Sequence, residues 1–432
     1  MAPFDWETLY VFGFLEVPLA SSTVDAVVVG AGPAGSTAAF VLARGGARVA
    51  LVDKATFGRD KACGDLVGPR ALALLASFGL APPAGRQVGE MMVVGPTGRR
   101  VLLPARAGRT YPDHGLAITR LRFDAWLRDA AIAAGADPVT GRVVAVRAGT
   151  VELDDGRRLV ADVIIGADGA TSGVAAAAGL VDPGAVLWGF AQRSYVAQDV
   201  DRPIIALWDE APGHGFPGYG WLFPGEAGTA NVGLGLGLGA DRSYASRAVA
   251  GFDTFCDHLR RLGLLSAPLE GRRLGGWLKM GMVGTVAARG RIFLVGDAAG
   301  LVNPLQGEGI APAMTSAAAA AEAILAGPGS AASRYRQHLA GGPGRYASVA
   351  APVHNSAITG SPRRVALLGR ALTLPGVGAA IASPWALTWN DLLDGAPRGP
   401  ATLASRLAVR IGRVATARTR VRRRLTRDLH DR

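Results

Sequence analysis

The chain has 432 residues, 60 of them glycine, and 49% of its residues are hydrophobic. This length allows two joined domains with a large core, and a composition without repeats or low-complexity stretches excludes a fibrous or disordered protein. Only Cys63 and Cys256 are present, so we expect no disulfide framework and a cytoplasmic location. The six histidines have no metal-ligand spacing, and we expect no metal site.

Residues 1–22 form an N-terminal extension before the first expected strand. They carry Asp5, Glu7 and Glu16 but no basic segment, so they do not resemble a secretory signal. An apolar run from Leu9 to Leu15 leaves open whether the extension is ordered.

A nucleotide-binding unit is predicted directly after this extension. A strand from Val24 to Val29 leads into a glycine turn, a helix from about Ser36 to Arg44, and a second strand from Arg48 to Val52. Glycines let a pyrophosphate approach the backbone, the helix N-terminus favours its charge, and an acid about 20 residues later can bind a ribose hydroxyl. The residues assigned to this site are Gly30, Gly32, Pro33, Ala34, Gly35, Asp53 and Lys54.

A mainly antiparallel sheet is expected in the middle of the chain. A turn at Gly95 to Gly98 joins two short apolar runs as a hairpin, and runs of alternating residues further along predict more strands. A helix is expected after Leu116, with Arg120 near its start. The expected strands of this sheet span residues 91–94, 101–103, 151–153, 189–196, 204–208, 219–223 and 230–238.

Two further strand ends carry an acid. The strand from Ala161 to Ile165 precedes Asp168, which alone would be typical of an ordinary capped turn. The strand from Ile292 to Val295 runs into Asp297 and then into the start of an alanine-rich helix. The acid can bind a sugar-like hydroxyl, and the helix start offers free N–H groups to an anionic ring. The residues assigned here are Asp168, Gly296, Asp297, Pro304, Gly307, Glu308, Gly309 and Ile310.

These three motifs, in this order and approximate spacing, resemble flavoproteins of the para-hydroxybenzoate hydroxylase type. The resemblance implies an α/β protein with a Rossmann-like FAD-binding domain, an inserted, mainly antiparallel β-sheet domain for the substrate, and a helical C-terminal region. It also implies that Arg120 lies near the flavin, although a surface arginine at a helix start would look the same. The implied division is an FAD-binding domain at 23–90, 115–180 and 285–330, a substrate-binding domain at 91–114 and 181–284, a helical region at 331–397 and a basic tail at 398–432.

Two other segments resemble the geranylgeranyl reductase family. They are Asp60 to Asp65 followed by Pro69 to Leu72, and Pro217 to Pro224. This resemblance implies an FAD-dependent reductase that saturates isoprenoid C=C bonds by hydride transfer from the reduced flavin. It assigns Lys61, Cys63 and Gly64 to the cofactor site, and Cys63, Tyr219, Trp221 and Phe223 to the catalytic site. Plain core packing is the alternative interpretation of the aromatic residues and of Cys63.

The chain departs from this family at two points. Leu66-Val67-Gly68 follows Asp65 where a further glycine and a leucine are usual, and Gly225-Glu226 follows Pro224 where a basic residue is usual. Because a cation would bind the anionic diphosphate, its loss weakens the prediction of a substrate with a diphosphate head group. A prenylated quinone or another uncharged polyprenyl or polyketide substrate is therefore as well supported as a prenyl diphosphate.

Other functions remain open on the sequence. An FAD monooxygenase that hydroxylates an aromatic or polyketide product would use the same flavin motifs. A flavin halogenase is less well supported, because Tyr219 and Phe223 replace residues of the halogenase tryptophan motif, and a non-catalytic prenyl-binding protein should have degraded flavin motifs. No second glycine fingerprint indicates a donor site, so the electrons come from NAD(P)H or from a carrier such as ferredoxin.

The C-terminal segments indicate a peripheral membrane contact. The formal net charge is +12, and residues 398–432 contain eleven arginines. Apolar residues recur among them at helical spacing, which is typical of a basic amphipathic helix at the inner membrane surface, although a solubilising tail is equally compatible. Residues 371–389 are uncharged, but Pro375 and Pro384 argue against a spanning helix and favour a hydrophobic flap. Nucleic acid is not an expected partner, because no aromatic residues are interleaved with the charge.

Overall fold

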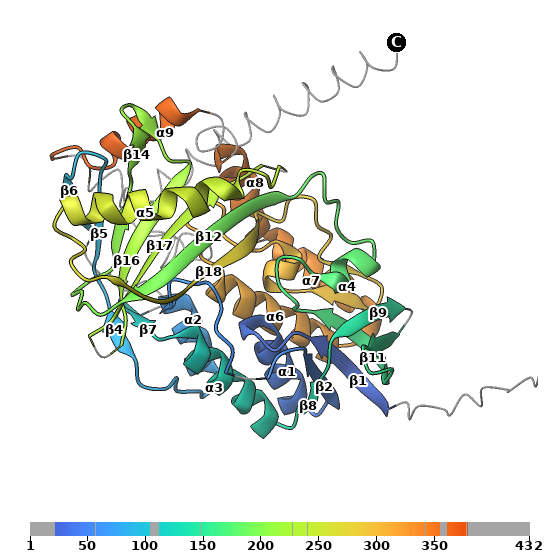
Figure 1. The fold of residues 1–432 in the computed structure, drawn as a ribbon. Helices are drawn as coiled ribbons and strands as arrows, with labels where there is room; N and C mark the ends of the chain where they lie inside the picture. The colour runs from blue at the N-terminus through green and yellow to red at the C-terminus, as the bar shows by residue number, and fades with distance from the viewer. Residues whose placement is uncertain are drawn as a thin grey trace, which may run out of the picture.

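The computed structural model describes residues 22–56, 58–103, 112–147, 149–226, 228–239, 241–341, 343–354, 361–376 and 378 (Figure 1). The N-terminal extension up to residue 21, most of the uncharged segment 371–389 and the basic tail lie outside the described residues.

The first of two large sheets has eight strands and includes the strands that precede Gly30, Asp168 and Asp297. Its central strands run parallel, in the order β20-β11-β1-β2-β8, and an antiparallel strand, β19, adds an edge. Val27 and Val28 of β1 are fully buried, as expected for a parallel strand covered on both faces. The strands are β1 (Ser22–Val29), β2 (Val49–Asp53), β8 (Asp137–Thr140), β9 (Val143–Arg147), β10 (Thr150–Leu153), β11 (Arg158–Gly166), β19 (Ala288–Arg289) and β20 (Ile292–Leu294). The expected placement of strand 151–153 in the middle sheet is wrong, because β10 pairs with β11 of this first sheet.

Helices pack on this first sheet and on each other. The helix α1 (Pro33–Arg44) contacts both α3 (Arg120–Ala133) and α6 (Ile310–Leu325), and α6 contacts α7 (Pro328–Gly341). The start of α1 lies three residues before the predicted one, because proline has no N–H to satisfy at the first helical position. A 3₁₀ turn, η1 (Gly296–Ala299), and a short helix, α4 (Gly173–Ala177), follow the ends of β20 and β11.

The second sheet has seven strands in the order β18-β12-β17-β16-β13-β5-β6, and all pairs except β13 with β5 are antiparallel. The 12-residue strand β18 was not predicted from the sequence, because its glycines and arginines lack a clear alternation. The predicted hairpin 91–94 with 101–103 is present. The strands are β5 (Met91–Val94), β6 (Arg100–Leu103), β12 (Leu187–Val196), β13 (Ile204–Ala206), β16 (Gly218–Pro224), β17 (Ala230–Gly237) and β18 (Leu269–Met280).

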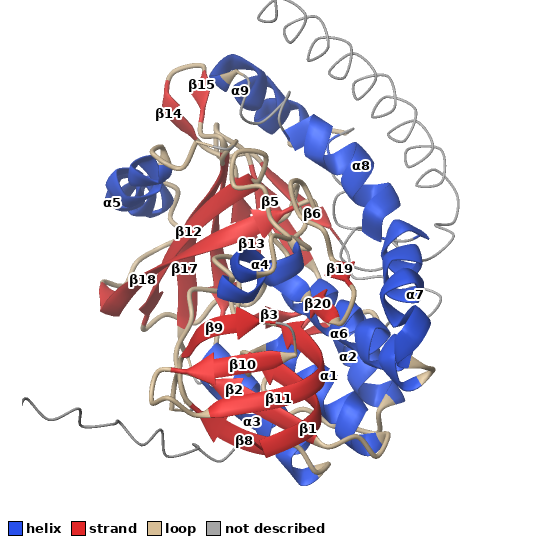
Figure 2. Ribbon diagram, turned by 90° about the vertical axis from the view of Figure 1, so that its right-hand side faces the viewer, coloured by secondary structure: helices blue, strands red, loops and turns tan. Residues whose placement is uncertain are grey.

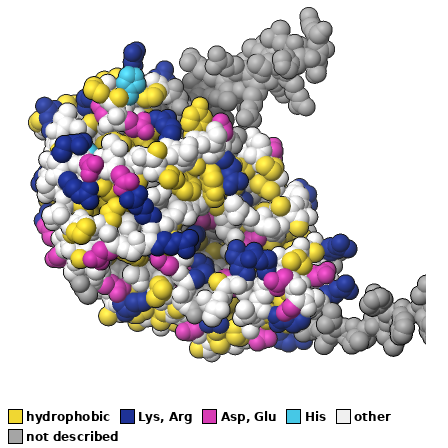
Figure 3. Space-filling model, viewed as in Figure 1, with side chains coloured by type: hydrophobic (Ala, Val, Ile, Leu, Met, Phe, Trp, Pro, Cys, Tyr) yellow, Lys and Arg dark blue, Asp and Glu magenta, His cyan; other side chains and the backbone are white. Residues whose placement is uncertain are grey.

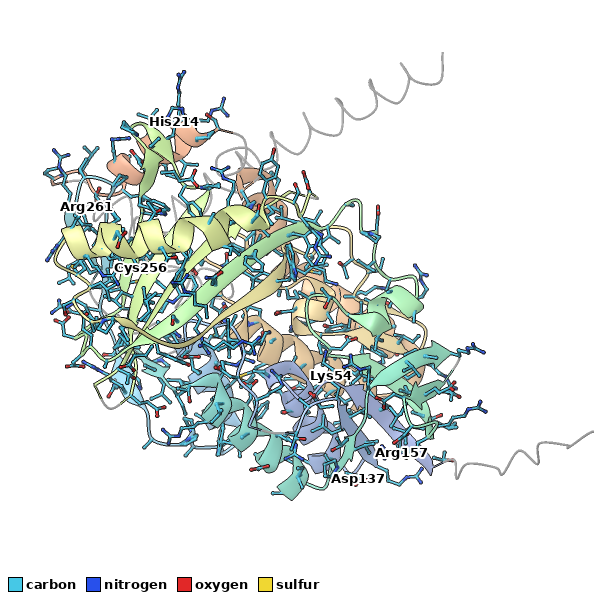
Figure 4. The ribbon with its side chains drawn as sticks, viewed as in Figure 1. Lys54, Asp137, Arg157, His214, Cys256 and Arg261 are labelled. Atoms are coloured by element: carbon cyan, nitrogen blue, oxygen red, sulfur yellow. The ribbon has the colours of Figure 1, made fainter. Side chains whose placement is uncertain are left out.

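One face of the second sheet is covered by α5 (Ala245–Arg261) (Figure 1). Phe252, Phe255 and Cys256 of this helix are buried in a core with Trp208 and Phe216. Figure 4 shows Cys256 and Arg261 on α5, well apart from Lys54 in the first sheet's half of the molecule. Burial raises the pKa of Cys256 to about 11, so this thiol is an inert member of the core.

Smaller elements join the two halves. A three-stranded sheet, β3 (Leu66–Val67), β7 (Gly115–Ala117) and β4 (Arg86–Val88), lies next to α2 (Pro69–Ser77), and β14 (Asp209–Ala211) pairs with β15 (His214–Gly215). The helices α7, α8 (Pro343–Val353) and α9 (Pro362–Ala371) follow one another along one side of the molecule, from the first sheet to β14 and β15 (Figure 2). Within the described ranges, no helix is long and apolar enough to cross a membrane.

Charged side chains of both signs are interspersed on the face shown in Figure 3, with apolar side chains between them. Ion pairs at α5 include Arg260 with Asp257 within the helix and Arg273 of β18 with Asp253.

Candidate active site

A cavity of about 980 Å³ extends from the carboxyl ends of β1 and β2 to the second sheet and α9. Ligands of open α/β sheets bind at such strand ends. The predicted site residues that line it are Gly30, Gly32, Pro33, Ala34, Asp53, Lys54, Lys61, Cys63, Gly64, Arg120, Asp168, Tyr219, Trp221, Phe223, Asp297, Pro304, Gly307, Glu308, Gly309 and Ile310. Gly35 and Gly296 are not among the lining residues and pack behind them.

The glycine turn after β1 allows close backbone packing. Gly30 has a φ of +100°, and a Cβ there would lie 2.5 Å from the carbonyl oxygen of Ala167, while a Cβ on Gly35 would lie 1.7 Å from the carbonyl oxygen of Gly30. The backbone N–H of Ala31 donates to Oδ2 of Asp53 at 2.7 Å. Asp53 thus holds the turn, and its carboxylate oxygens retain further lone pairs for a ribose hydroxyl.

Two acids lie further along the cavity. Asp168 accepts a hydrogen bond from the N–H of Val174 through Oδ2, whereas its buried Oδ1 has no partner among the described residues. Asp297 forms an ion pair with Lys61, with Nζ 3.4 Å from Oδ2. The amine of Lys279 is buried near both acids, and this burial lowers its pKa to about 8 although the two acids act in the opposite direction.

The start of α6 faces the same cavity. Gly309 is its N-cap and provides no side-chain cap, and Glu308 accepts a hydrogen bond from the N–H of Ala311 through Oε1 at 2.8 Å. Burial raises the pKa of Glu308 to about 7. Gly307 has a φ of +69°, which favours glycine. The helix start therefore presents backbone N–H groups to the cavity.

These features fit FAD. The glycine turn admits a pyrophosphate, the unpartnered Oδ1 of Asp168 and the carboxylate of Asp297 can accept hydroxyl hydrogens, and the start of α6 can hold the anionic side of a flavin ring. The residues that would hold FAD come from three segments far apart in the chain, because the parallel sheet brings the carboxyl ends of β1, β11 and β20 together.

We call the glycine turn, Asp168, Asp297 and the start of α6 the FAD cradle. Cys63 lies between the FAD cradle and the second sheet, beside a buried arginine. The guanidinium of Arg120 donates to both carboxylate oxygens of Asp124 at 2.6 Å, and its charge acts on the nearby thiol of Cys63. Burial raises the pKa of the Cys63 thiol, although the nearby Arg120 cation acts in the opposite direction. Arg120 is 4% exposed, so it is not a surface residue of the helix start. The thiol is protonated and has a cation next to it.

Three aromatic side chains form one wall of the cavity. Tyr219, Trp221 and Phe223 alternate along β16 and therefore point to the same side of the sheet. Trp221 pairs across the strands with Gly233, where a Cβ would lie 2.0 Å from the indole Cζ2. The glycine alternation of β17 thus makes room for aromatic rings. The hydroxyl of Tyr219 donates to the carbonyl oxygen of Gln306, next to Gly307.

A buried polar network holds the loop that carries Cys63. Asp65 has a φ of +59° and is 3% exposed, and its Oδ2 accepts from the Tyr195 hydroxyl at 2.6 Å and from Nδ2 of Asn231 at 2.9 Å. Asn231 also donates to the carbonyl oxygen of Cys63 and accepts from the indole N–H of Trp221. The network fixes the thiol relative to the aromatic wall.

Comparison with known proteins assigns this fold and cavity to a family. The FAD binding domain family matches residues 23–334. The menaquinone reductase of Mycolicibacterium smegmatis is 36% identical over 71% of this chain and 78% of its own length. The geranylgeranyl diphosphate reductase of Rhodobacter capsulatus is 33% identical over 70% of this chain and 75% of its own.

The chain belongs to the geranylgeranyl reductase family of FAD-dependent oxidoreductases. Membership confirms the resemblance read from the two sequence segments, the α/β fold with its Rossmann-like FAD-binding part, and the assignment as a flavoenzyme.

Solved structures agree on the fold. A geranylgeranyl bacteriochlorophyll reductase-like protein of Thermoplasma acidophilum has a TM-score of 0.64 and 22% identity, and covers 84% of this chain and 99% of its own. A flavin-dependent brominase has a TM-score of 0.67 and 18% identity, and covers 90% of this chain and 98% of its own. At such identity the likeness concerns the fold alone, and it does not distinguish reduction from other flavin chemistry.

The cavity is also lined by residues that no sequence motif indicates. Their signals are weak in the sequence because they lie on elements far apart in the chain. They are Arg59, Met91, Pro96, Ile205, Leu207, Trp208, Phe216, Trp277, Leu278, Met280, His354, Val365, Leu368, Gly369 and Leu372. Arg59 lies beside Gly32 and Asp124 on the FAD side of the cavity. The others are mostly apolar and line the part of the cavity that reaches α9, which we call the apolar branch.

Proposed function

We propose that this protein saturates C=C bonds of a hydrophobic isoprenoid substrate by hydride transfer from reduced FAD. One observation carries this proposal: the FAD cradle and the apolar branch belong to one continuous cavity, and Cys63, Tyr219 and the aromatic wall lie where the two meet. A long apolar chain can therefore lie in the branch with one double bond held at the flavin end. Related enzymes whose names describe reduction of menaquinone and geranylgeranyl diphosphate support the substrate class.

The chain's own residues supply alignment, dryness and a proton. An isolated alkene is a poor hydride acceptor, so it must be held in a reactive geometry and receive a proton on its second carbon. FAD, when bound and reduced, supplies the hydride to the first carbon. Cys63 is the proton donor in this proposal, because burial keeps its thiol protonated and the Arg120 cation stabilises the thiolate that remains. The aromatic wall excludes water and orients the chain.

The head group of the substrate is uncharged in this proposal. Every lysine and arginine among the described lining residues belongs to the FAD side of the cavity: Lys54, Arg59, Lys61, Arg120 and Arg142. Glu226, which stands where the family usually has a cation, pairs with Arg122 and faces the N–H of Thr119. Among the described residues, the cavity therefore offers a diphosphate no cation on the substrate side, which favours a prenylated quinone or a similar lipid.

Two associations of the protein remain part of the proposal. Electrons reach FAD from NAD(P)H or from a small carrier protein such as ferredoxin. A peripheral contact with the inner membrane surface is supported by α9, where Leu367 and Leu368 are 67% and 43% exposed and the helix also lines the apolar branch. Such a contact would let a lipid substrate enter the cavity from the bilayer.

Product mass tests the proposed reaction. The purified flavoprotein is reduced chemically and offered prenyl diphosphates, menaquinones and polyketide extracts. A product heavier than its substrate by two hydrogens supports a reductase. A product heavier by one oxygen would instead assign a monooxygenase, a halogenated product would assign a halogenase, and a colourless protein that only binds prenyl groups would remove catalysis altogether.

A further inference from the structure

The side chain of His354 lies in the cavity and has a defined tautomer. It follows directly after α8, is 2% exposed, and its Nδ1 lies 2.6 Å from the carbonyl oxygen of Pro304. A carbonyl oxygen can only accept, so Nδ1 carries the hydrogen of the neutral ring. Burial lowers the pKa of His354 to about 4, which keeps the imidazole neutral near pH 7. Its Nε2 is therefore a hydrogen-bond acceptor.

This acceptor is buried and has no partner among the described residues. The ring packs against Gly237 of β17, where a Cβ would lie 1.9 Å from Cε1 and 2.2 Å from Nε2. Gly237, Leu236 and Met280 line the cavity beside it. A buried acceptor without a donor costs free energy, so a donor from a bound molecule would be favoured there.

The position of His354 relates this acceptor to the reaction site. Pro304, which holds the imidazole, is two residues before Gln306, which accepts from the Tyr219 hydroxyl, and three residues before Gly307 at the flavin end. A molecule bound at Nε2 would thus lie beside the aromatic wall rather than at the distant end of the apolar branch.

We propose that Nε2 of His354 accepts a hydrogen bond from a hydroxyl on the uncharged head group of the isoprenoid substrate. The inference rests on the proposed function and narrows it. A hydroxyl of a hydroquinone or of a prenyl alcohol can donate, whereas a quinone carbonyl, an ester and an ionised diphosphate can only accept. His354 is then a specificity-determining residue that selects the hydroxyl form of the head group.

Binding of matched ligand pairs to the oxidised holoenzyme tests this inference. The probes are a polyprenylated naphthol and its methyl ether, and a polyprenyl alcohol and its methyl ether, titrated by calorimetry in detergent. Each ether keeps the shape of its partner but has no donor. We expect the naphthol, the alcohol or both to bind about tenfold more tightly than the matching ether, the effect of one buried hydrogen bond. The arm that shows the difference identifies the source of the hydroxyl.

Variants attribute the effect to the imidazole. His354→Phe should reduce the ratio of hydroxyl to ether affinity to about one, and Gly237→Ala, which displaces the ring, should lower it as well. His338→Phe, at an exposed histidine of α7, should leave the ratio unchanged. FAD content and thermal unfolding of each variant show that it is folded.

Equal affinity of hydroxyl and ether probes for the unmodified holoenzyme would overturn the inference without any variant, and so would failure of every hydroxyl probe to bind. These outcomes are separate from the proposed reaction. Hydrogenation of a substrate with no hydroxyl preference would overturn only the role of His354. A hydroxyl preference without hydrogenation of any substrate would overturn only the proposed function.

Discussion

Nδ2 of Asn231 lies 2.9 Å from Oδ2 of Asp65 and joins β17 of the second sheet to the loop that carries Cys63. The two residues are 166 positions apart in the chain. Burial raises the pKa of Asp65, although the hydrogen bonds from Tyr195 and Asn231 act in the opposite direction. The position of the thiol relative to the aromatic wall depends on this long-range contact.

Asn231→Leu should destabilise the protein by about 2 kcal/mol, because it removes the hydrogen bonds of Asn231 to Asp65, Cys63 and Trp221 and leaves the buried carboxyl of Asp65 less satisfied. Thermal unfolding of the FAD-bound variant measures the loss. Tyr195→Phe, which removes one hydrogen bond from the same carboxyl, is the matched comparison and should cost less. An Asn231→Leu variant as stable as the unmodified protein would show that the network contributes nothing.

Gly35→Ala should abolish FAD binding. A Cβ at this position would lie 1.7 Å from the carbonyl oxygen of Gly30, so the glycine turn would have to move away from the pyrophosphate position. The ratio of flavin to protein absorbance after purification reports the FAD content. Gly329→Ala on α7, where a Cβ meets nothing within 4 Å, should keep its full complement of flavin.

Gly233→Ala should displace the indole of Trp221 and destabilise the protein by about 1–3 kcal/mol, the usual cost of overpacking. Tryptophan fluorescence and thermal unfolding measure the two effects. Gly235→Ala is a close control on the same face of β17, because a Cβ there would lie 3.5 Å from Cζ3 of Trp221, an ordinary contact. Similar behaviour of the two variants would contradict the described packing of the indole.

The pH dependence of the free energy of unfolding should show the lowered pKa of the buried Lys279 amine. Its pKa is lowered from 10.5 to about 8 in the folded protein, so between these values the unfolded chain binds more protons. The free energy of unfolding should therefore rise with pH in this window, and the penalty for the buried charge is complete below pH 8. FAD-free protein is compared with its Lys279→Met variant, which lacks this pH dependence. If the free energies of unfolding of the two proteins differ by a constant amount from pH 7 to 11, the lowered pKa of Lys279 is contradicted.

The elements of the candidate FAD site could be predicted from the sequence because their signals are local. Strand, glycine turn, helix and acid follow one another around Gly30 and Asp53, and a strand, an acid and a helix start recur around Asp297 and Gly307. The assignment of these residues to FAD stays a prediction, although most of them line the cavity. The catalytic roles assigned to Cys63, Tyr219, Trp221 and Phe223 stay predictions, although all four line the cavity.

The features that could not be predicted from the sequence depend on contacts between segments far apart in the chain. β18 is a strand because it pairs with β12 along its length, and its glycines and charges conceal that role in the sequence. His354 is one of six histidines without a motif. Its orientation depends on the hydrogen bond to the carbonyl oxygen of Pro304 and on the absence of a side chain at Gly237. Neither relationship has a spacing that a sequence pattern could reveal.

The most direct test of the central claim is an anaerobic single turnover with chemically reduced enzyme and a polyprenylated quinol. The proposed reductase should regain the absorption of oxidised flavin without oxygen, at a rate that depends on the polyprenyl substrate, and should yield a product two hydrogens heavier. Flavin that stays reduced until oxygen is admitted, followed by an oxygenated product, would contradict the account.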